Sequence, residues 1–343
     1  MAPRCTDSAV VAPLFLVAVA LSAPASCGQS YYPPTNASWT RVASNPVLSP
    51  SAAWEGTCVC ENVVLFENDT YKMWYRGGWS ETGIGFATSS DGIAWEKHVG
   101  NPVYGGGGSG VRTSPGEPWV SKFNGLYWLY TTDNSGPFMN VSTSPNGLLW
   151  TPQAAACPLP PGATLWGNRV VWTEGVGTWK MLQEAMAGGL WQIFLFSSAD
   201  GLVWVIGNGG APLMTLQVHA SGMYGGPRFA RLGAELVPRF PDGLYHLWYH
   251  AGTDGGGLPT DIFHATSADL LNWRVSPVTP VLTHAGSGWE WDQVAGPVPV
   301  VPAPSAPGQA LLYYDGDNNV KDTCSIGAAT SPAVLLLGDR ANT

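Results

Sequence analysis

Charged residues are scarce in this 343-residue chain, at 11% of the sequence, against roughly 25% in an average globular domain. The 15 Lys and Arg residues are outnumbered by 24 Asp and Glu residues, and the net charge is -9. The basic residues are scattered singly along the chain, so the sequence has no basic patch. A protein that binds nucleic acid needs such a patch, and the composition therefore gives no support for a nucleic-acid partner.

Long hydrophobic runs are also missing. The main apolar stretch covers about twelve residues, 10–21, and is interrupted by Pro13, whereas a membrane-spanning helix needs about 20. Arg4 precedes this stretch and small residues follow it, which is typical of a secretory signal peptide. We therefore predict a signal peptide over residues 1–27 and expect no membrane span.

Three acceptor sequons for N-glycosylation fit an exported protein. They begin at Asn36, Asn68 and Asn140, and each has the Asn-x-Ser/Thr pattern that is glycosylated on surface segments of secreted proteins. We expect the mature chain, residues 28–343, to be secreted to the extracellular space as a single domain and to be a monomer.

Cysteine is rare as well, and two of the six cysteines fall within residues 1–27. The pair Cys58-x-Cys60 has no histidine partners at metal-binding spacing, so no metal site is predicted. In an oxidising compartment a disulfide is expected instead. We predict that Cys324 pairs with either Cys58 or Cys60.

What the sequence does contain is an internal repeat that joins a short polar turn to a tryptophan. Four complete copies occur, at 85–95, 140–150, 194–204 and 263–273. A fifth copy is split, with its front half at 325–335 and its back half at 38–48. Repeats of this period indicate a stacked or radial architecture. Because one unit is divided between the two ends of the chain, we predict that the repeats close into a ring.

Each repeat is expected to contribute four antiparallel strands. An aromatic strand precedes every polar turn, at 71–77, 127–133, 179–185, 245–251 and 310–316. The Asp-Gly and Asn-Gly turns between extended runs are strong hairpin signals. The sequence therefore predicts an all-β fold, a five-bladed β-propeller, whose last blade is completed by the N-terminal strand. Ring closure would also bring Cys324 beside the Cys58-x-Cys60 pair.

Charged side chains are expected to gather at one mouth of this ring, where inner strands begin and aromatic strands end. Aligning the repeats on their aromatic strands places acids and bases at these points: Glu61, Glu117, Glu184, Asp315, Arg76, Arg169 and His250. Trp54 and Asp292, which belong to Trp-Glu and Trp-Asp pairs ahead of the first and last inner strands, are further candidates for contacts with a sugar. These tryptophans could equally be structural plugs.

The segments YKMWYRG, IGFATSSDGIAW and NPV together resemble the five-bladed glycoside hydrolase superfamily of invertases, levansucrases and families 43 and 130. The resemblance covers essentially the whole mature chain. It implies one acid in each of the first three blades, acting as base or nucleophile, as transition-state stabiliser and as proton donor. Glu61, Glu117 and Glu184 occupy those blades. The family ordinarily has Asp at the first two positions, and its donor lies nearer the inner strand than Glu184 does.

Two functions are consistent with these features. The first is a secreted glycoside hydrolase that acts on an oligo- or polysaccharide, with Glu61 as base or nucleophile, Glu117 as stabiliser, Glu184 as proton donor and Asp315 in reserve. The second is a non-catalytic propeller that binds glycans in the same funnel. A sialidase is disfavoured, because the turn is one residue shorter than the sialidase Asp-box and six blades would be needed. No cofactor is predicted, and the sequence leaves open a structural calcium ion.

Overall fold

The computed structural model describes residues 30–32, 39–78, 83–105, 115–133, 138–188, 190–213, 228–229, 243–252, 259–275, 279–300, 309–319, 321–332 and 334–336. The predicted signal peptide and the sequon at Asn36 lie outside these residues. Within them, every regular element is a β-strand apart from three-residue 3₁₀ turns. No helix in this part of the chain is long and apolar enough to cross a membrane. The predicted all-β class is confirmed.

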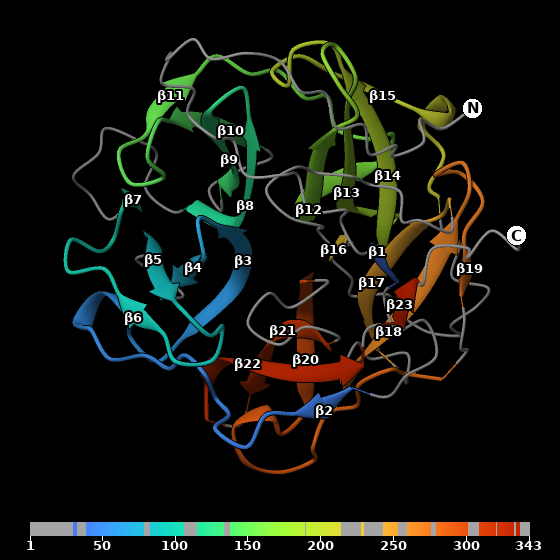
Figure 1. Cartoon of the computed structure of the whole chain (residues 1–343). Helices are drawn as coiled ribbons and strands as arrows, with labels where there is room; N and C mark the ends of the chain where they lie inside the picture. The colour runs from blue at the N-terminus through green and yellow to red at the C-terminus, as the bar shows by residue number, and fades with distance from the viewer. Residues whose placement is uncertain are drawn as a thin grey trace, which may run out of the picture.

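The strands fall into groups that follow the sequence repeats, and Figure 1 shows these groups arranged around a common centre. Repeat 1 contains β3 (Val59–Glu67), β4 (Thr70–Gly77), β5 (Gly83–Ser89), β6 (Glu96–Lys97) and β7 (Tyr104–Gly105). Repeat 2 contains β8 (Pro115–Phe123), β9 (Leu126–Asp133), β10 (Phe138–Ser144) and β11 (Thr151–Gln153). Repeat 3 contains β12 (Ala163–Thr173), β13 (Trp179–Ala187), β14 (Leu190–Ser198) and β15 (Trp204–Ile206).

The remaining strands form repeats 4 and 5. Repeat 4 contains β16 (Arg228–Phe229), β17 (Tyr245–Gly252), β18 (Thr260–Ser267) and β19 (Arg274–Val275). Repeat 5 contains β20 (Gln293–Val300), β21 (Gln309–Asn318) and β22 (Thr323–Pro332). A single parallel pair, Thr260 with Gln293, joins these two antiparallel groups into one eight-stranded sheet. The elements outside the repeats are β1 (Ser30–Tyr32), which pairs with β23 (Val334–Leu336), and the turns η1 (Ala53–Glu55), η2 (Asn208–Gly210) and η4 (Gly288–Glu290).

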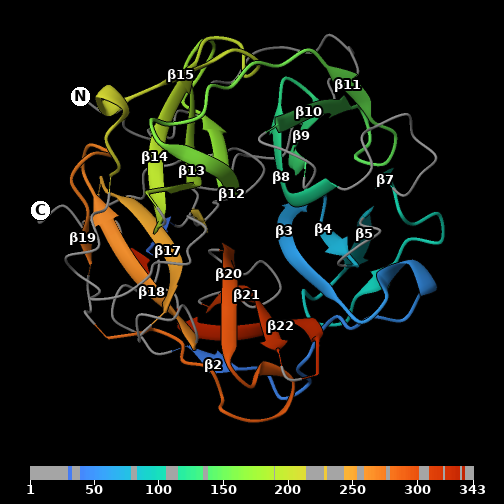
Figure 2. The same ribbon diagram turned by 180° about the vertical axis from the view of Figure 1, so that it is seen from behind.

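The N-terminal segment pairs with the C-terminal half-repeat. Strand β2 (Thr40–Arg41) runs antiparallel to β22, and Leu48 forms a further bridge to Ile326. Figures 1 and 2 show β2 beside β22 from both sides of the molecule. The pairing predicted for residues 38–48 is therefore present, and it covers the edge that β22 would otherwise expose.

One polar turn is built in the same way in each complete repeat. In repeat 1, the Ser89 hydroxyl accepts a hydrogen bond from the N–H of Gly92 (2.9 Å), and Asp91 Oδ1 accepts from the next two backbone N–H groups. Gly92 adopts a φ of 79°, a conformation that costs glycine little. The equivalent serines are Ser144, Ser198 and Ser267. The repeated sequence motif is thus a local turn that orders its own backbone.

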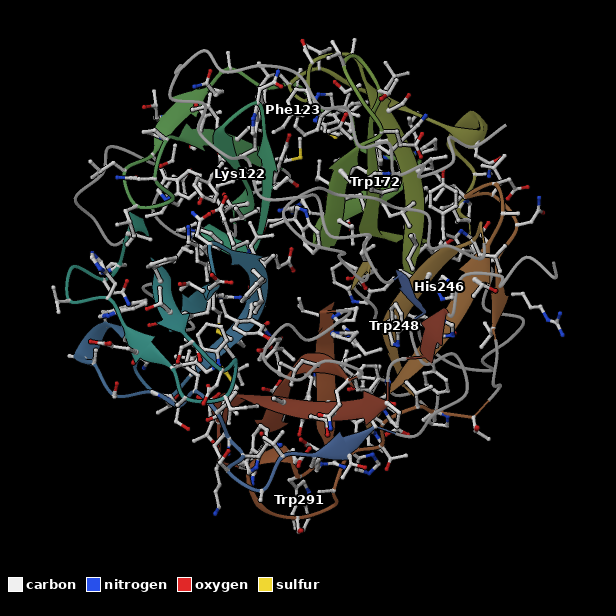
Figure 3. The ribbon with its side chains drawn as sticks, in the orientation of Figure 1. Lys122, Phe123, Trp172, His246, Trp248 and Trp291 are labelled. Carbon is white, nitrogen blue, oxygen red and sulfur yellow. A yellow bond between two sulfur atoms is a disulfide. The ribbon has the colours of Figure 1, made fainter. Side chains whose placement is uncertain are left out.

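Buried aromatic residues join three pairs of neighbouring repeats. The indole N–H of Trp74 in repeat 1 donates to the carbonyl of Gly147 in repeat 2 (2.8 Å). The Tyr130 hydroxyl of repeat 2 donates to Gly201 of repeat 3, and the Tyr313 hydroxyl of repeat 5 donates to Gly92 of repeat 1. Side chains such as Trp172 pack between the sheets (Figure 3). The same contact therefore connects the last repeat to the first.

Candidate active site

Four inner strands carry a β-bulge at the same point of the repeat. The ladder register shifts between Cys60 and Val63, between Gly116 and Trp119, between Trp166 and Arg169, and between Ala295 and Val298. In three of these bulges the first residue is left-handed: Glu61 (φ 51°), Glu117 (φ 50°) and Gly296 (φ 51°). This conformation is uncommon for residues other than glycine, and bulges often re-aim side chains beside active sites. Glu61 and Glu117 are therefore marked as functional candidates by their backbone.

The N–H of each of these three bulge residues donates to a side chain of the preceding repeat. The N–H of Gly296 donates to Nδ1 of His250 (3.3 Å), and the N–H of Glu61 donates to Oδ2 of Asp315 (2.9 Å). The N–H of Glu117 donates to Oε2 of Glu61 (2.6 Å). These bonds satisfy N–H groups that the bulge removes from the ladder of hydrogen bonds between the strands. They also link repeat 4 to repeat 5, repeat 5 to repeat 1 and repeat 1 to repeat 2 through predicted site residues.

The side chain of Glu61 is held by a cation and a backbone donor. Its Oε1 accepts from Arg76 NH1 at 2.7 Å, and its Oε2 accepts the N–H of Glu117. Burial disfavours the charged form of Arg76, but the charges of Glu61, Cys60 and Glu117 and the hydrogen bond to Glu61 together outweigh burial, so the pKa of Arg76 lies above its usual value. Both oxygens of Glu61 are thus engaged by donors.

Glu117 lies in the opposite electrostatic situation. Its Oε2 is buried and accepts no hydrogen bond from the described residues, and the nearest cation is Arg169 NH2, 3.8 Å away. Burial, and after it the negative charge of Glu61, raises the pKa of Glu117 to about 7, although Arg169 and Arg76 act to lower it. Glu117 can therefore donate or accept a proton near neutral pH, as a general acid–base residue requires.

Arg169 donates hydrogen bonds to carbonyl and amide oxygens. Its Nε donates to Gln183 Oε1 (2.8 Å), NH1 to the Glu117 carbonyl (3.1 Å) and NH2 to the Gly167 carbonyl (3.2 Å). The predicted alignment of Arg169 with Glu61 and Glu117 is wrong, because the bulge of β12 holds Gly167 and Arg169 follows it. Arg169 nevertheless reaches the predicted cluster through its contact with Glu117.

Glu184 is also out of the predicted alignment. The residues that pair with the position just before each bulge are Arg76, Thr132 and Asp315, and in β13 that residue is Ala185. Five pairs separate the hairpin from the bulge in both repeats, but Trp179 is the first paired residue of β13 whereas Tyr71 is the second of β4, so alignment on these aromatic residues shifts Glu184 by one position. Its buried carboxylate lies against Gly167, where an added Cβ would come within 2.5 Å of Oε2. Hydrogen bonds link Glu184 to Arg169 through Gln183, which donates to the Glu184 carbonyl.

Asp315 supports Glu61 from the neighbouring repeat, and Asp317 adds an acid that the sequence analysis missed. Asp315 accepts from the N–H of Glu61 and, through Oδ1, from Asn62 Nδ2 (3.1 Å). Burial, followed by the charges of Asp315, Asp292 and Glu61, raises the pKa of Asp317 well above its usual value. The signal was present in the sequence, because residues 315 and 317 share one face of a strand.

The aromatic candidates pack as structural elements. The ring of Trp54 stacks on Tyr75, with centroids 6.0 Å apart, and covers Gly77, where an added Cβ would lie 2.3 Å from the indole. Trp289 covers Gly316 in the same way, and Figure 3 shows Trp291 at the periphery of the molecule. Asp292 accepts a hydrogen bond from Asn319 Nδ2 (3.2 Å). Trp54 therefore packs as a structural plug.

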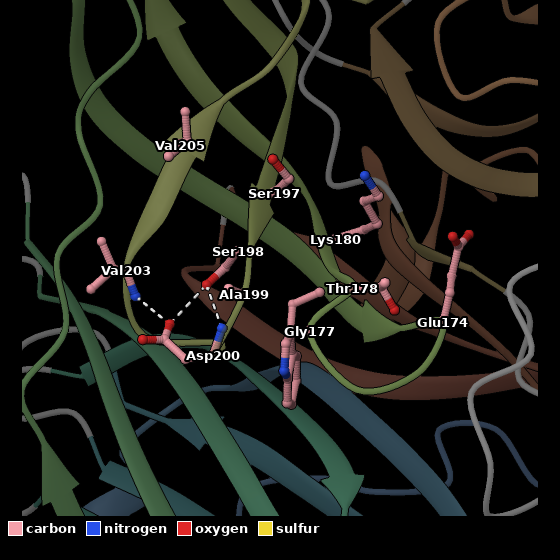
Figure 4. A pocket seen from close by; sticks show the side chains of 11 residues that line it. Glu174, Gly177, Thr178, Lys180, Ser197, Ser198, Ala199, Asp200, Val203 and Val205 are labelled. Atoms are coloured by element: carbon pink, nitrogen blue, oxygen red, sulfur yellow. Dashed lines mark hydrogen bonds between the residues drawn. The ribbon is translucent and has the colours of Figure 1, made fainter.

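The predicted glycosylation sites differ in exposure. Asn68 is exposed in the tight turn between β3 and β4, whereas Asn140 is half-buried and pairs with Thr131 inside the sheet of repeat 2. A cavity of about 550 Å³ lies elsewhere, at the beginning of β13, and is lined by residues such as Lys180, Ser197 and Asp200 (Figure 4). It contains none of the predicted site residues.

The chain has the fold of the propeller glycoside hydrolases. A structure described as a glycoside hydrolase superimposes with a TM-score of 0.65 at 13% identity, covering 88% of this chain and 92% of the other. A family-130 structure, whose family is described as containing hydrolases that target β-1,2 mannosidic linkages in Candida mannan, gives 0.64 at 17% identity, covering 90% and 99%. A thermostable family-43 glycoside hydrolase gives 0.58 at 13% identity, covering 83% and 95%. No protein-family model matches the sequence, and comparison with curated proteins finds no match.

Proposed function

We propose that this protein is a secreted glycoside hydrolase that cleaves glycosidic bonds in an oligo- or polysaccharide, on a five-bladed β-propeller closed by its N-terminal strand. The likeness to solved glycoside hydrolases supports the fold. The pairing of β2 with β22 and the contact from Tyr313 to Gly92 support closure of the ring. The short apolar N-terminal stretch and the sequons support secretion.

One observation carries the proposed activity: Glu61 and Glu117 are adjacent acids with different partners. Glu61 is ion-paired with Arg76 at 2.7 Å, and the pKa of Glu117 is raised to about 7. Glycoside hydrolysis needs one carboxylic acid to protonate the leaving-group oxygen and one carboxylate to act as nucleophile or base. An ion-paired acid beside an acid that holds its proton near neutral pH suits these two roles.

The contacts support roles for Glu117 and Glu61 that differ from those predicted from the sequence. Glu117 takes the role of proton donor, because burial and the charge of Glu61 keep its proton near neutral pH. Glu61 takes the role of the partner acid that stabilises positive charge on the sugar, supported by Asp315 and Arg76. Arg169 limits how far the pKa of Glu117 rises. A donor role for Glu184 stays a prediction.

A non-catalytic glycan-binding protein is the second candidate, and one observation favours it. Both oxygens of Glu61 are already engaged, by Arg76 and by the N–H of Glu117, which reduces their availability for attack on a sugar. A carboxylate displaced by about 1 Å can lose a hundredfold in rate, and Glu in place of Asp makes a displacement of this size.

A panel of aryl glycosides and polysaccharides separates these candidates. Turnover by the wild-type protein, with loss in Glu117→Gln but not in Glu96→Gln, supports the hydrolase, since Glu96 lies exposed on β6. Glycan binding by calorimetry without any product supports the binding protein.

A further inference from the structure

Three buried cysteine side chains meet where repeat 5 contacts repeat 1. Cys58 and Cys324 form a disulfide, which confirms the predicted bridge and selects Cys58 as its partner. The Sγ of Cys60 is a free thiol 3.5 Å from the Sγ of Cys58, and the three sulfur atoms lie within 4.8 Å of one another. Thiol–disulfide exchange begins from a thiol placed against a disulfide in this way.

We propose that Cys58, Cys60 and Cys324 form an exchange site, in which the disulfide moves from the inter-repeat bridge Cys58–Cys324 to a local bridge Cys58–Cys60. The Cys60 thiol first loses its proton to solvent, and its thiolate then attacks the Sγ of Cys58. The Cys58–Cys324 bond breaks with its electron pair on Cys324, which takes up a proton. One thiol and one disulfide are present before and after, so no oxidant or reductant is consumed.

The local bridge is within reach of the two sulfur atoms but needs a change in the backbone. Cys58 and Cys60 are two residues apart along an extended segment, so their side chains point to the same side, and their Sγ atoms are 3.5 Å apart. A rise of about 3.3 Å per residue separates both their Cα and their Cβ atoms by roughly 6.6 Å, whereas a disulfide needs a Cβ separation of about 3.5–4.5 Å. The new bond therefore needs a local contraction of the segment from Cys58 to Cys60.

The charges that face Cys60 hold this exchange back at neutral pH. Burial and the adjacent Glu61 raise the pKa of the Cys60 thiol well above its usual value, Asp315 and Asp317 add to this rise, and Arg76 opposes it. Only the thiolate attacks a disulfide. The Cys58–Cys324 bridge seen in the structure is therefore slow to exchange at neutral pH, and exchange requires alkaline pH or a local opening of the cluster.

The exchange site is connected to the carboxylate cluster on both strands. Cys60 directly precedes Glu61, and Cys324 pairs with Asp317, two residues beyond Asp315. Transfer of the bridge would remove the covalent link between β22, which pairs with the Asp315 strand β21, and the segment that leads into β3. This change would loosen the hydrogen bond from Glu61 to Asp315. This consequence for activity rests on the proposed function, whereas the exchange itself does not.

Disulfide mapping of the full-length protein, purified without reductant, tests the proposal. Samples held at about pH 7 and about pH 9.5, which bracket thiol ionisation, are quenched in acid and denatured. Free thiols are then labelled with N-ethylmaleimide, and the label is located by peptide mass spectrometry. Within the cluster, we expect the label on Cys60 at neutral pH, and at least a threefold gain of label on Cys324 at alkaline pH with a matching loss from Cys60; Cys157 should be labelled at both pH values.

Two variants complete the test. Cys60→Ser should keep the Cys58–Cys324 bridge at both pH values, and Cys157→Ser, which removes a free thiol outside the cluster, should respond like the wild type. If Cys60→Ser does not fold, the wild-type maps still decide the result. Within the cluster, label confined to Cys60 at both pH values, or a Cys60–Cys324 bridge, overturns the proposal. Since the mapping needs no substrate, absence of glycosidase activity would leave its outcome unchanged.

Discussion

The backbone N–H of Glu117 donates to Oε2 of Glu61 at 2.6 Å, across the boundary between repeats 1 and 2. This bond fixes the left-handed backbone of Glu117 by means of the carboxylate whose charge helps to raise its pKa. The position of Glu117 and its pKa therefore both depend on Glu61. A substitution at Glu61 should alter both.

Replacing Glu61 by Gln should lower the pKa of Glu117. The substitution removes the negative charge that, after burial, contributes most to the rise of that pKa to about 7, while an amide oxygen can still accept the N–H of Glu117. Because Arg76 and Arg169 would remain, we expect a decrease of about one unit or more, a typical effect of a neighbouring like charge. Carboxyl resonances followed by NMR during a pH titration measure it, and an unchanged pKa for Glu117 would show that the two acids do not interact.

Glu117→Gln should stabilise the protein at alkaline pH. A carboxyl whose folded pKa is about 7 binds its proton more tightly than in the unfolded chain, where its pKa is about 4.3. Its stabilising contribution is fully present below about pH 4 and is lost as pH rises to about 7, at about 1.4 kcal/mol per pKa unit. The wild type should thus lose up to roughly 3 kcal/mol over this range, and Glu117→Gln should not. Urea unfolding at several pH values measures the difference, and parallel stability curves for the two proteins would contradict it.

Loss of the Cys58–Cys324 bridge should destabilise the fold. The bridge joins residues 266 positions apart, and a loop of this length is expected to contribute roughly 5 kcal/mol on the chain-entropy account. Cys324→Ser should therefore lower the melting temperature in scanning calorimetry, with Cys157→Ser as the matched control. Equal melting temperatures for the two variants would mean that the bridge does not hold the repeats together.

Trp54 and Gly77 should show strong energetic coupling. Gly77→Ala places a methyl group where the indole lies, so we expect it to cost roughly 1–3 kcal/mol, as overpacking does. In a double-mutant cycle, Trp54→Ala should remove most of that cost. If the two effects simply add, Trp54 does not plug the sheet and its role as a sugar contact regains support.

Much of the fold was predictable because its signals are local. Ser89 and Asp91 fold their turn through hydrogen bonds within a few residues, so the motif is visible wherever it recurs. The bulge lies five strand pairs beyond the hairpin in repeats 1, 2 and 3, but the hairpin loop differs in length, with two residues between Glu67 and Thr70 and five between Thr173 and Trp179. Alignment on the aromatic residues does not contain that difference, and for this reason Arg169 and Glu184 were misaligned. The proton affinity of Glu117 depends on burial and on Glu61 of another repeat, which neither residue reveals alone.

The most direct test of the central claim compares Glu117→Gln with the wild type on two substrates that differ only in their leaving group. A general acid is needed to protonate a poor leaving group, such as a sugar hydroxyl, and much less for a nitrophenolate. We expect kcat/KM to fall by at least about a hundredfold on the natural linkage, the usual contribution of a general acid, and by far less on the nitrophenyl glycoside. An equal loss on both substrates, or no loss on either, would contradict the assignment of Glu117 as the proton donor.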